Sequence, residues 1–250
     1  MDLQLRGKTA LVTGASAGIG RQTAKSLAAE GVRVCITARR RELLDELASE
    51  IVAAGGTVPE IVALDIMESG APVRLAREAE ALLGSIDILV NNAGGSRPLP
   101  IDAPDARWDE AMTLNFERVR QLTHAILPGM IAREWGRIIN VTGKQEPERL
   151  NAAYSAKAAV HAWAKGLSRE VGRYGITVNS IPPGRIISEQ ILRNNPEDVR
   201  REFAAKNIPV GRFGQPEELA CLIVFLASPV ACYISGTVIP VDGGLRRYTF

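Results

Sequence analysis

The chain has little of what marks several protein classes. Its three cysteines, Cys35, Cys221 and Cys232, have no C-x-x-C spacing, which argues against a disulfide framework or a zinc site. No uninterrupted apolar run approaches the roughly 20 residues that cross a bilayer. The first residues lack the cationic and apolar segments of a signal peptide. We therefore expect a cytoplasmic protein with no disulfide, no metal and no membrane partner.

Charge of one sign is missing as well. Lys and Arg number 30 against 28 Asp and Glu, which gives a net charge of +2, and the two signs are interleaved. Nucleic-acid-binding proteins usually carry a basic arm or stripe, so no nucleic-acid partner is expected. No internal repeat and no linker rich in proline, glycine or serine divides the chain. Residues 1–250 are therefore expected to form a single domain.

Short apolar runs alternate with longer amphipathic segments along the whole chain. The runs are rich in Val and Ile and are too short for helices, which is typical of buried strands. They lie at 9–13, 32–37, 58–64, 86–90, 137–141, 176–181 and 238–241. Apolar residues recur at helical spacing in 20–30, 42–54, 73–83, 108–131, 152–174 and 217–226. Strict alternation predicts an α/β fold with a parallel sheet, helices on both faces and right-handed crossovers.

A glycine-rich segment joins the first strand to the first helix. It reads Thr13-Gly14-Ala15-Ser16-Ala17-Gly18-Ile19-Gly20. Glycines let the backbone turn sharply and approach a pyrophosphate, and a helix N-terminus adds free N–H groups and a favourable dipole. The segment therefore predicts a dinucleotide site.

Five motifs in this order resemble the short-chain dehydrogenase/reductase family over nearly the full length. They are T-G-x-x-x-G-x-G at 13–20, N-N-A-G at 91–94, a lone Asn115, Pro183-Gly184 and V-D-G-G at 241–244. The resemblance is to enzymes of the 3-oxoacyl-acyl-carrier-protein reductase type. It implies a Rossmann-like, doubly wound sheet of seven parallel strands in the order 3-2-1-4-5-6-7, assembled as a homotetramer.

The end of the second strand indicates which nicotinamide cofactor is bound. An acid at this point favours the free 2′-hydroxyl of NAD, but the strand ends in Arg39, Arg40 and Arg41. A planar guanidinium suits a phosphate and offsets its charge. We expect Arg39 to bind the 2′-phosphate of NADP, and Arg40 and Arg41 to open a solvated helix. NADP is thus favoured over NAD, and the resemblance adds the Ser16 hydroxyl to the same phosphate.

The resemblance also implies contacts along the carboxyl edge of the sheet. Asp65 and Ile66 follow the third strand, where the family binds adenine, and residues 91–94 pass beneath the adenine ribose. Ile186 offers backbone groups to the carboxamide, and Ser188 stands where a threonine is usual. The full expected cofactor set is Gly14, Ser16, Gly18, Ile19, Gly20, Arg39, Asp65, Ile66, Asn92, Ala93, Gly94, Lys157, Pro183, Gly184, Ile186 and Ser188.

Family members transfer hydride between the nicotinamide and a carbonyl or hydroxyl carbon, while a tyrosine exchanges the proton. A lysine four residues later lowers the tyrosine pKa, a serine polarises the substrate oxygen, and an asparagine matching Asn115 orders a water relay. An unperturbed tyrosine, with a pKa of about 10, is poorly matched to neutral pH. The resemblance implies a small carbonyl or alcohol substrate. The segment 185–212 is charged and helical in pattern, and we expect it to act as the substrate lid.

The tyrosine departs from the family spacing. Only two residues separate Tyr154 from Lys157, where relatives have three. Lys157 precedes Asn179 by 22 residues, the family spacing, so Lys157 is in register and Ala153 stands in the tyrosine position. One helical position corresponds to about 100° of rotation. Tyr154 is either the proton donor, if the first helical turn adjusts, or a packing residue.

The serine position is altered too. Gly143 stands where relatives carry the serine, preceded by Thr142 and followed by Lys144. Thr142 is expected to supply a hydroxyl if the loop is remodelled, and Lys144 offers a charge. His124 and His161 fall in helical segments away from the motifs, and both are expected to pack on helix faces.

Two hypotheses follow. The first is an NADP-dependent oxidoreductase with atypical proton-transfer geometry and the catalytic residues Tyr154, Lys157, Asn115 and Thr142. The second is a cofactor-binding relative without efficient hydride chemistry, serving as a redox sensor or a scaffold. The altered tyrosine and serine positions favour the second hypothesis, whereas Asn115 and Lys157 favour the first.

Overall fold

A sheet of parallel strands forms the centre of the computed structural model, which describes residues 1–143 and 146–248. Six strands pair in the order β3-β2-β1-β4-β5-β6 within the described residues. Their bounds are β1 (Thr9–Thr13), β2 (Arg33–Ala38), β3 (Glu60–Ala63), β4 (Ile88–Asn91), β5 (Gly136–Val141) and β6 (Ile176–Ile181). The expected doubly wound parallel sheet is confirmed, with the reversal of strand order at β1 and β4.

The expected seventh strand is present as a segment but not as a regular strand. Residues 237–241 run parallel to the end of β6, and isolated bridges join them to Ser180 and Pro183. Proline has no amide donor, so Pro182, which accepts a hydrogen bond from the amide of Val241 at 3.2 Å, cannot donate to the carbonyl of Ile239, and the ladder is interrupted there. The segment therefore keeps the seventh place in space, while the described sheet has six strands instead of seven.

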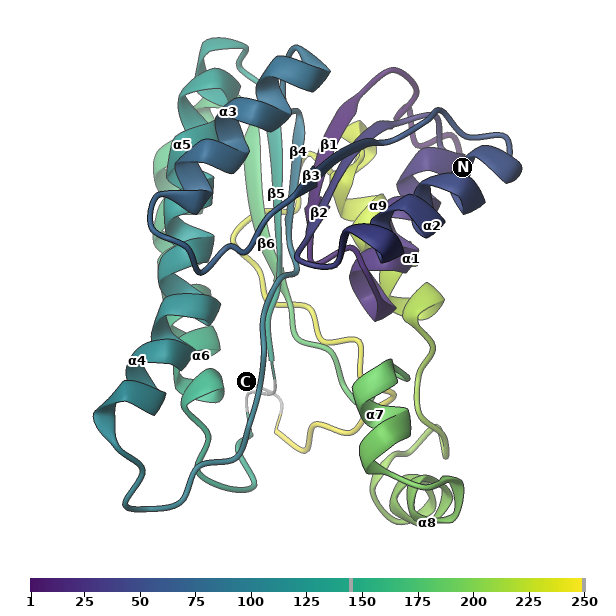
Figure 1. Ribbon diagram of the computed structural model, residues 1–250, viewed down its shortest axis with the longest axis vertical. Coiled ribbons are helices and arrows are strands. Elements are labelled where there is room, and N and C mark those ends of the chain that lie inside the picture. The colour runs from purple at the N-terminus through teal and green to yellow at the C-terminus, as the bar shows by residue number, and fades with distance from the viewer. Residues whose placement is uncertain (144–145, 249–250) are drawn as a thin grey trace.

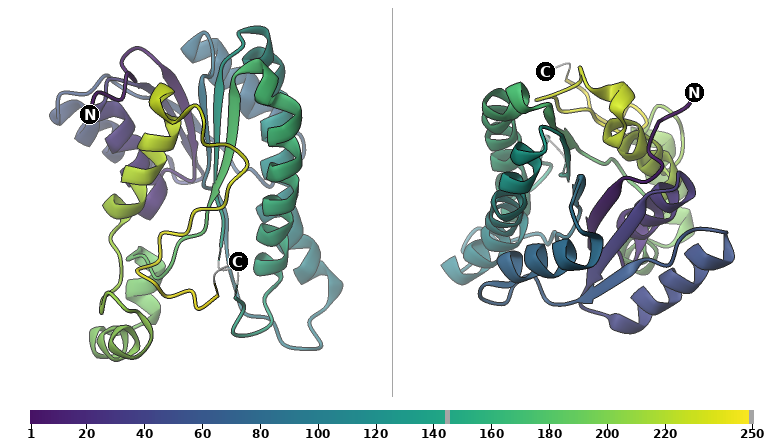
Figure 2. Two further views of the ribbon diagram at one scale, coloured as in Figure 1. Left: turned by 180° about the vertical axis from the view of Figure 1, so that it is seen from behind. Right: turned by 90° about the horizontal axis from the view of Figure 1, so that it is seen from above.

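Helices cover both faces of the sheet (Figures 1 and 2). One face carries α1 (Gly18–Ala29), α2 (Arg41–Ala53) and α9 (Pro216–Ala227). The other carries α3 (Ala71–Leu83), α4 (Asp105–Met112), α5 (Arg118–Ala132) and α6 (Ala152–Val171). Short 3-10 turns follow α6 and α9, at Gly172–Tyr174 and Pro229–Ala231.

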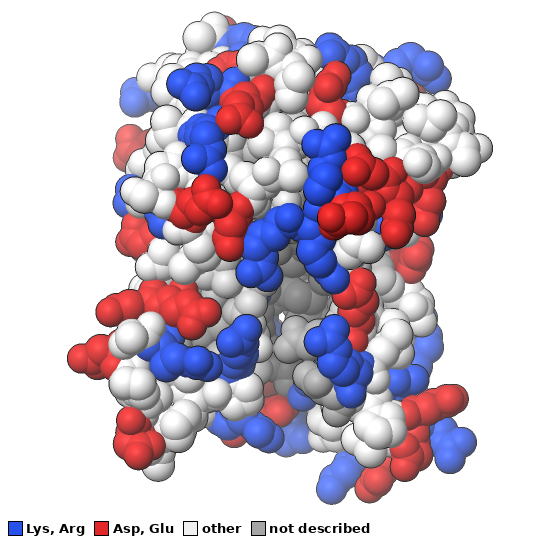
Figure 3. Space-filling view, viewed as in Figure 1, with Lys and Arg blue, Asp and Glu red and all other residues white. Residues whose placement is uncertain are grey.

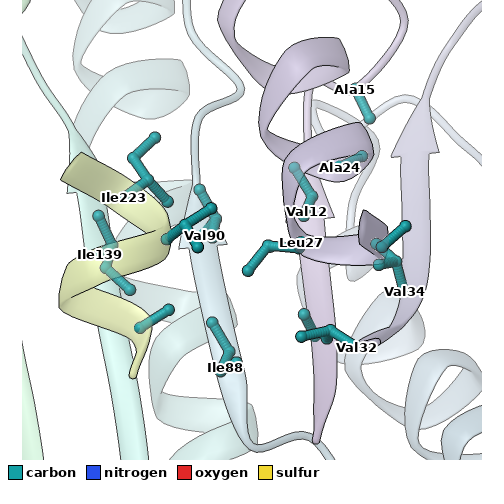
Figure 4. Packing of buried hydrophobic residues seen from close by; sticks show 14 of the residues in the cluster. Val12, Ala15, Ala24, Leu27, Val32, Val34, Ile88, Val90, Ile139 and Ile223 are labelled. Carbon is teal, nitrogen blue, oxygen red and sulfur yellow. The ribbon is translucent and has the colours of Figure 1, made fainter. Parts of the chain in front are cut away.

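Apolar side chains fill the space between the sheet and each helix layer. In the layer of α1 and α9, Leu27 and Ile223 belong to one buried cluster with Val12, Val90 and Ile139 of the strands (Figure 4). All five side chains are at most 1% exposed. Removing this apolar area from water is the main stabilising contribution, and it fixes the strands whose carboxyl ends carry the site.

A π-helical turn interrupts the long helix expected at 108–131. It spans Thr113–Glu117, between α4 and α5, and its one buried residue is Asn115. Such turns occur frequently at functional sites. The turn therefore marks the place where Asn115 enters the interior.

The segment expected to act as a lid, residues 185–212, lies beyond the carboxyl ends of the strands (Figure 1). It contains α7 (Glu189–Asn194) and α8 (Glu197–Asn207). Ala204 and Ile208 form a small core of their own with Phe213. Across the described ranges, no helix combines the length and hydropathy needed to cross a membrane.

Candidate active site

The glycine-rich segment forms the turn between β1 and α1. Gly14 and Gly18 have φ values of +66° and +54°, a region that side chains other than glycine rarely adopt. A Cβ atom on Gly14 would lie 2.9 Å from Nδ2 of Asn92. That amide donates hydrogen bonds to the carbonyls of Thr13 and Gly14 at 3.0 and 3.1 Å. The N-N-A-G motif thus supports the glycine-rich turn from the neighbouring strand.

The N-terminus of α1 has no side-chain cap. Ala17 occupies the cap position, and the first turn holds no acid. A Cβ on Gly18 would find only Cβ of Ser188, at 3.6 Å. Free N–H groups at a helix N-terminus with space in front of them suit a phosphate, so this end of the site fits the pyrophosphate of a dinucleotide.

Arg40, which the sequence suggested only opens a solvated helix, lies beside Ser16. Its Nη2 donates to Oγ of Ser16 at 3.4 Å, and its Nη1 is 3.4 Å from the Glu189 carboxylate on α7. Arg39 instead approaches Asp65, with 3.8 Å between Nη1 and Oδ2, and its side chain is 76% exposed. The sequence assigned the phosphate to Arg39, whereas Arg40 is the arginine that the structure places against Ser16. The available signal was the position of Arg40 directly before the helix.

The other expected adenine residues lie between the ends of β3 and β4. Asp65 accepts a hydrogen bond from the amide of Met67 at 2.9 Å. Ile66 and Ala93 line a small hollow together with Asn91. The structure therefore brings together the residues that the resemblance assigned to the adenosine.

The segment after β6 forms the opposite end of the groove. Ser188 caps α7, because its Oγ accepts a hydrogen bond from the amide of Ile191 at 3.2 Å. A Cβ on Gly184 would lie 2.5 Å from Cα of Asp242, so the P-G and V-D-G-G motifs are in contact. The side chain of Ile186 is buried in the layer of α1 and α9.

Helix α6 runs from Ala152 with Asn151 as its N-cap, which decides which residues share a face with Lys157. Oδ1 of Asn151 accepts from the amide of Ala153 at 3.0 Å, and the amide of Tyr154 donates to the carbonyl of Asn151 at 3.0 Å. Residues four apart lie on one face of a regular helix, so Ala153 faces the same way as Lys157, and Tyr154 lies about 100° away. The Tyr154 hydroxyl makes no hydrogen bond to any residue that the structure describes.

Lys157 lies between two glycines. Its Nζ donates a hydrogen bond to the backbone carbonyl of Thr142 at 3.1 Å. A Cβ on Gly94 would be 3.5 Å from Nζ, and one on Gly143 would be 3.0 Å from Cδ. Desolvation by the surrounding protein lowers the pKa of Lys157 to about 8. This amine can therefore gain and lose a proton close to neutral pH.

Asn115 meets Lys157 at Gly94. The Asn115 Oδ1 accepts from the amide of Gly95 at 3.1 Å, and its Nδ2 donates to the carbonyl of Ala111 at 2.9 Å. The same Oδ1 would lie 2.9 Å from a Cβ on Gly94. The π turn and α6 thus bring Asn115 and Lys157 to one backbone position at the end of β4.

The hydroxyl expected to replace the serine is held by a histidine. Oγ1 of Thr142 is 2.7 Å from Nε2 of His161, and Thr142 is 2% exposed. Burial, with a smaller contribution from the charge of Lys157, lowers the pKa of His161. Sequence reasoning missed this contact, because it joins residues 19 positions apart on different elements.

Two remaining candidates contribute less. The ring of His124 lies 6.1 Å from that of Trp163 on the next helix, which is the packing role expected for it. Lys144, considered as a possible charge near the serine position, lies outside the described residues.

A cleft opens beside Asn115 and Ala153. It lies between residues 95–99, α4 and the start of α6, and its charged lining residues within the described chain are Arg97, Arg107 and Glu110. The position of Ala153 in its wall places the cleft next to the face of α6 that carries Lys157.

The arrangement matches known proteins along nearly the whole chain. A family model described as enoyl-(acyl carrier protein) reductase matches residues 14–246. A 3-oxoacyl-[acyl-carrier-protein] reductase of Pseudomonas aeruginosa is 37% identical over 247 residues, which covers 97% of this chain and 99% of the relative. Gluconate 5-dehydrogenase of Gluconobacter oxydans is also 37% identical, with 96% and 95% covered. The solved L-sorbose reductase of Gluconobacter frateurii, in complex with NADPH and L-sorbose, superposes with a TM-score of 0.93 at 32% identity, with 99% and 100% covered.

Proposed function

Because the chain belongs to the short-chain dehydrogenase/reductase family of oxidoreductases, we propose that it interconverts a carbonyl and a hydroxyl group with NADP as the hydride carrier. One observation carries this proposal, namely the meeting of Lys157 and Asn115 at Gly94, beside the glycine-rich turn. An amine that can exchange a proton, that of Lys157, would thus lie next to the turn that binds the dinucleotide.

The residues present fit NADP. The uncapped N-terminus of α1 suits the pyrophosphate, and Arg39, Arg40 and Ser16 form a cationic, hydroxyl-bearing corner for the 2′-phosphate. Asp65 and Ile66 would hold the adenine side, Lys157 the nicotinamide ribose, and Ile186 and Ser188 the carboxamide. NADP would supply the hydride, as the NADPH bound to the sorbose reductase suggests.

The protein itself would supply the proton that the substrate oxygen takes up during reduction. Reduction places a proton on the substrate oxygen, and Lys157 is able to give one up near neutral pH. Thr142 positions this lysine through its carbonyl, and Asn115 fixes the backbone of Gly95. Tyr154 is the other proposed donor, and its role depends on reaching the reacting oxygen from the adjacent face of α6.

We also propose that the protein assembles as a homotetramer and that residues 185–212 close over the substrate. The irregular segment 237–241 is only partly buried in one chain, and its free edge offers backbone groups for subunit contact. Sedimentation equilibrium should give about four times the 26.9 kDa of one chain. A mass of one chain at micromolar concentration would contradict the assembly.

The activity is tested with purified protein in two measurements. Calorimetry is expected to show NADPH binding roughly tenfold tighter than NADH, as expected when a guanidinium meets the extra phosphate. Loss of NADPH absorbance should then follow the addition of ketones, keto acids or acyl thioesters. Tight NADPH binding with no turnover on any of these substrates would instead favour a sensor or scaffold.

A further inference from the structure

Two arginines line the cleft beside Ala153 without a partner of opposite charge. Among the residues that the structure describes, neither Arg97 nor Arg107 forms an ion pair or a hydrogen bond through its guanidinium. Arginines on the neighbouring helix behave differently, since Arg118 donates to Gln121 at 2.8 Å and Arg120 pairs with Glu117 at 2.7 Å. An unpaired guanidinium that lines a cleft is free to bind a ligand.

The charge of the cleft is positive. Its charged lining residues in the described chain are Arg97, Arg107 and Glu110. Arg107 and Glu110 are three residues apart on α4, where helical neighbours often pair, yet no ion pair joins them. An anion entering the cleft therefore meets an excess of positive charge. Elsewhere on the face seen in Figure 3, Lys and Arg side chains lie on both sides of the central hollow, with Asp and Glu side chains beside them.

The other polar side chains of the cleft can form hydrogen bonds with the hydroxyl groups of a ligand. Asn151 is buried, and its Nδ2 donates to Oγ of Ser96 at 2.9 Å. That leaves the Ser96 hydroxyl as a donor toward the cleft, while the Glu110 carboxylate can accept. Both residues line the cleft together with the two arginines.

The cleft reaches Asn115 and the start of α6. Ala153 and Asn115 both line it, and Ala153 occupies the face of α6 that carries Lys157. A ligand that spans the cleft therefore has one end at the arginines and the other next to the site of proton exchange.

We propose that Arg97 and Arg107 form a carboxylate subsite, and that the preferred substrates are small hydroxylated keto acids or the corresponding hydroxy acids. A guanidinium matches a carboxylate with two parallel hydrogen bonds. This inference rests on the proposed oxidoreductase function, because it places the carbonyl of the same molecule near Lys157.

The test uses two matched probes, L-sorbose and the keto acid in which a carboxylate replaces its hydroxymethyl group farthest from the ketone. With NADPH in excess, kcat/KM is expected to be roughly tenfold higher for the keto acid, and the preference should fall as salt screens the arginines. Calorimetry of the keto acid with the protein alone gives a second measurement that needs no turnover.

Variants locate the subsite. Arg97→Gln and Arg107→Gln should each lower the ratio of acid to neutral kcat/KM roughly tenfold, mainly through KM, and weaken acid binding by a similar factor. Glu110→Gln should strengthen acid binding. The matched control is Arg77→Gln on α3, an exposed arginine outside the cleft, which should leave the ratio unchanged.

The outcomes separate this inference from the proposed function. Acid binding that depends on Arg97 and Arg107 but consumes no NADPH would retain the subsite and reject the oxidoreductase. Turnover with equal preference for the two probes, or a ratio unaffected by both arginine variants, would overturn the subsite alone. Absence of both acid binding and acid turnover would overturn it as well.

Discussion

Gly143 sets the path of Lys157, since a Cβ atom at position 143 would lie 3.0 Å from Cδ of the lysine. The stem of Lys157 passes over the glycine on its way to the carbonyl of Thr142. The missing side chain at the serine position and the hydrogen bond of the lysine are therefore parts of one arrangement.

Gly143→Ala is expected to move the Lys157 stem by a few tenths of an ångström, because the added Cβ would lie 3.0 Å from Cδ, and thereby to strain its bond to Thr142 and weaken NADPH binding. The loss of affinity should be several-fold at most, the scale of one weakened hydrogen bond. Gly166→Ala is the matched control, since a Cβ there meets no atom within 4 Å. Calorimetry with NADPH compares the two variants, and equal affinities would contradict the coupling.

NADPH binding should weaken as pH rises through about 8, the pKa to which burial lowers Lys157. The sign follows from the amine, which is charged below its pKa and attracts an anionic cofactor only in that form. The nearby titratable group, His161, has a lowered pKa and is neutral in this range. Lys157→Arg should remove the transition between about pH 7 and 9, whereas Lys165→Met, on the same helix, should keep it. A flat profile in the unmodified protein would be evidence against the charged amine as a cofactor ligand.

Discrimination between NADPH and NADH should depend on Arg40 as well as Arg39. Arg40 contacts Ser16 at 3.4 Å, so Arg40→Gln is expected to reduce the ratio of the two affinities by roughly tenfold, or about 1.4 kcal/mol. Arg39→Ala should reduce it too. Arg41→Gln is the control, because Arg41 pairs with Asp45 at 3.0 Å on the exposed side of α2. An unchanged ratio in both Arg39 and Arg40 variants would reject this corner as the phosphate site.

Tyr154→Phe distinguishes the two roles left open for this tyrosine. Ala153, and not Tyr154, lies four residues before Lys157 in α6, although Cδ1 of Tyr154 would be 4.0 Å from a Cβ on Gly143. We therefore expect a small effect on kcat and unchanged NADPH affinity. A loss of about a hundredfold or more in kcat, which is typical of removing a general acid, would identify Tyr154 as the proton donor. Steady-state rates with NADPH held in excess provide the measurement.

The sheet and its order were accessible from sequence because buried parallel strands are continuous apolar runs and glycine motifs sit at fixed strand ends. The spacing from Lys157 to Asn179 likewise indicated that Ala153 would share a face with the lysine. The irregular seventh segment was harder to foresee, since its apolar pattern resembles a strand and only the prolines argue against regular pairing.

Side-chain contacts between elements far apart in the chain could not be predicted from the sequence. Arg40 lies 24 residues from Ser16 and 149 from Glu189. No local sequence pattern indicates which residues an exposed guanidinium contacts. The same holds for the bond between Thr142 and His161, and for the cleft lined by Arg97 and Arg107. These features depend on how loops and helices pack at the sheet edge.

The π turn at Thr113–Glu117 makes the position of Asn115 sensitive to the deletion of a single residue. Such a turn amounts to one inserted residue in an otherwise α-helical segment, so the direction in which Asn115 points is encoded by chain length as well as by residue type. Loss of a single codon in this turn would restore a regular helix and rotate α5 by about 100° relative to α4. Point substitutions cannot produce that change. Insertions and deletions in this segment therefore alter the site as much as substitutions do.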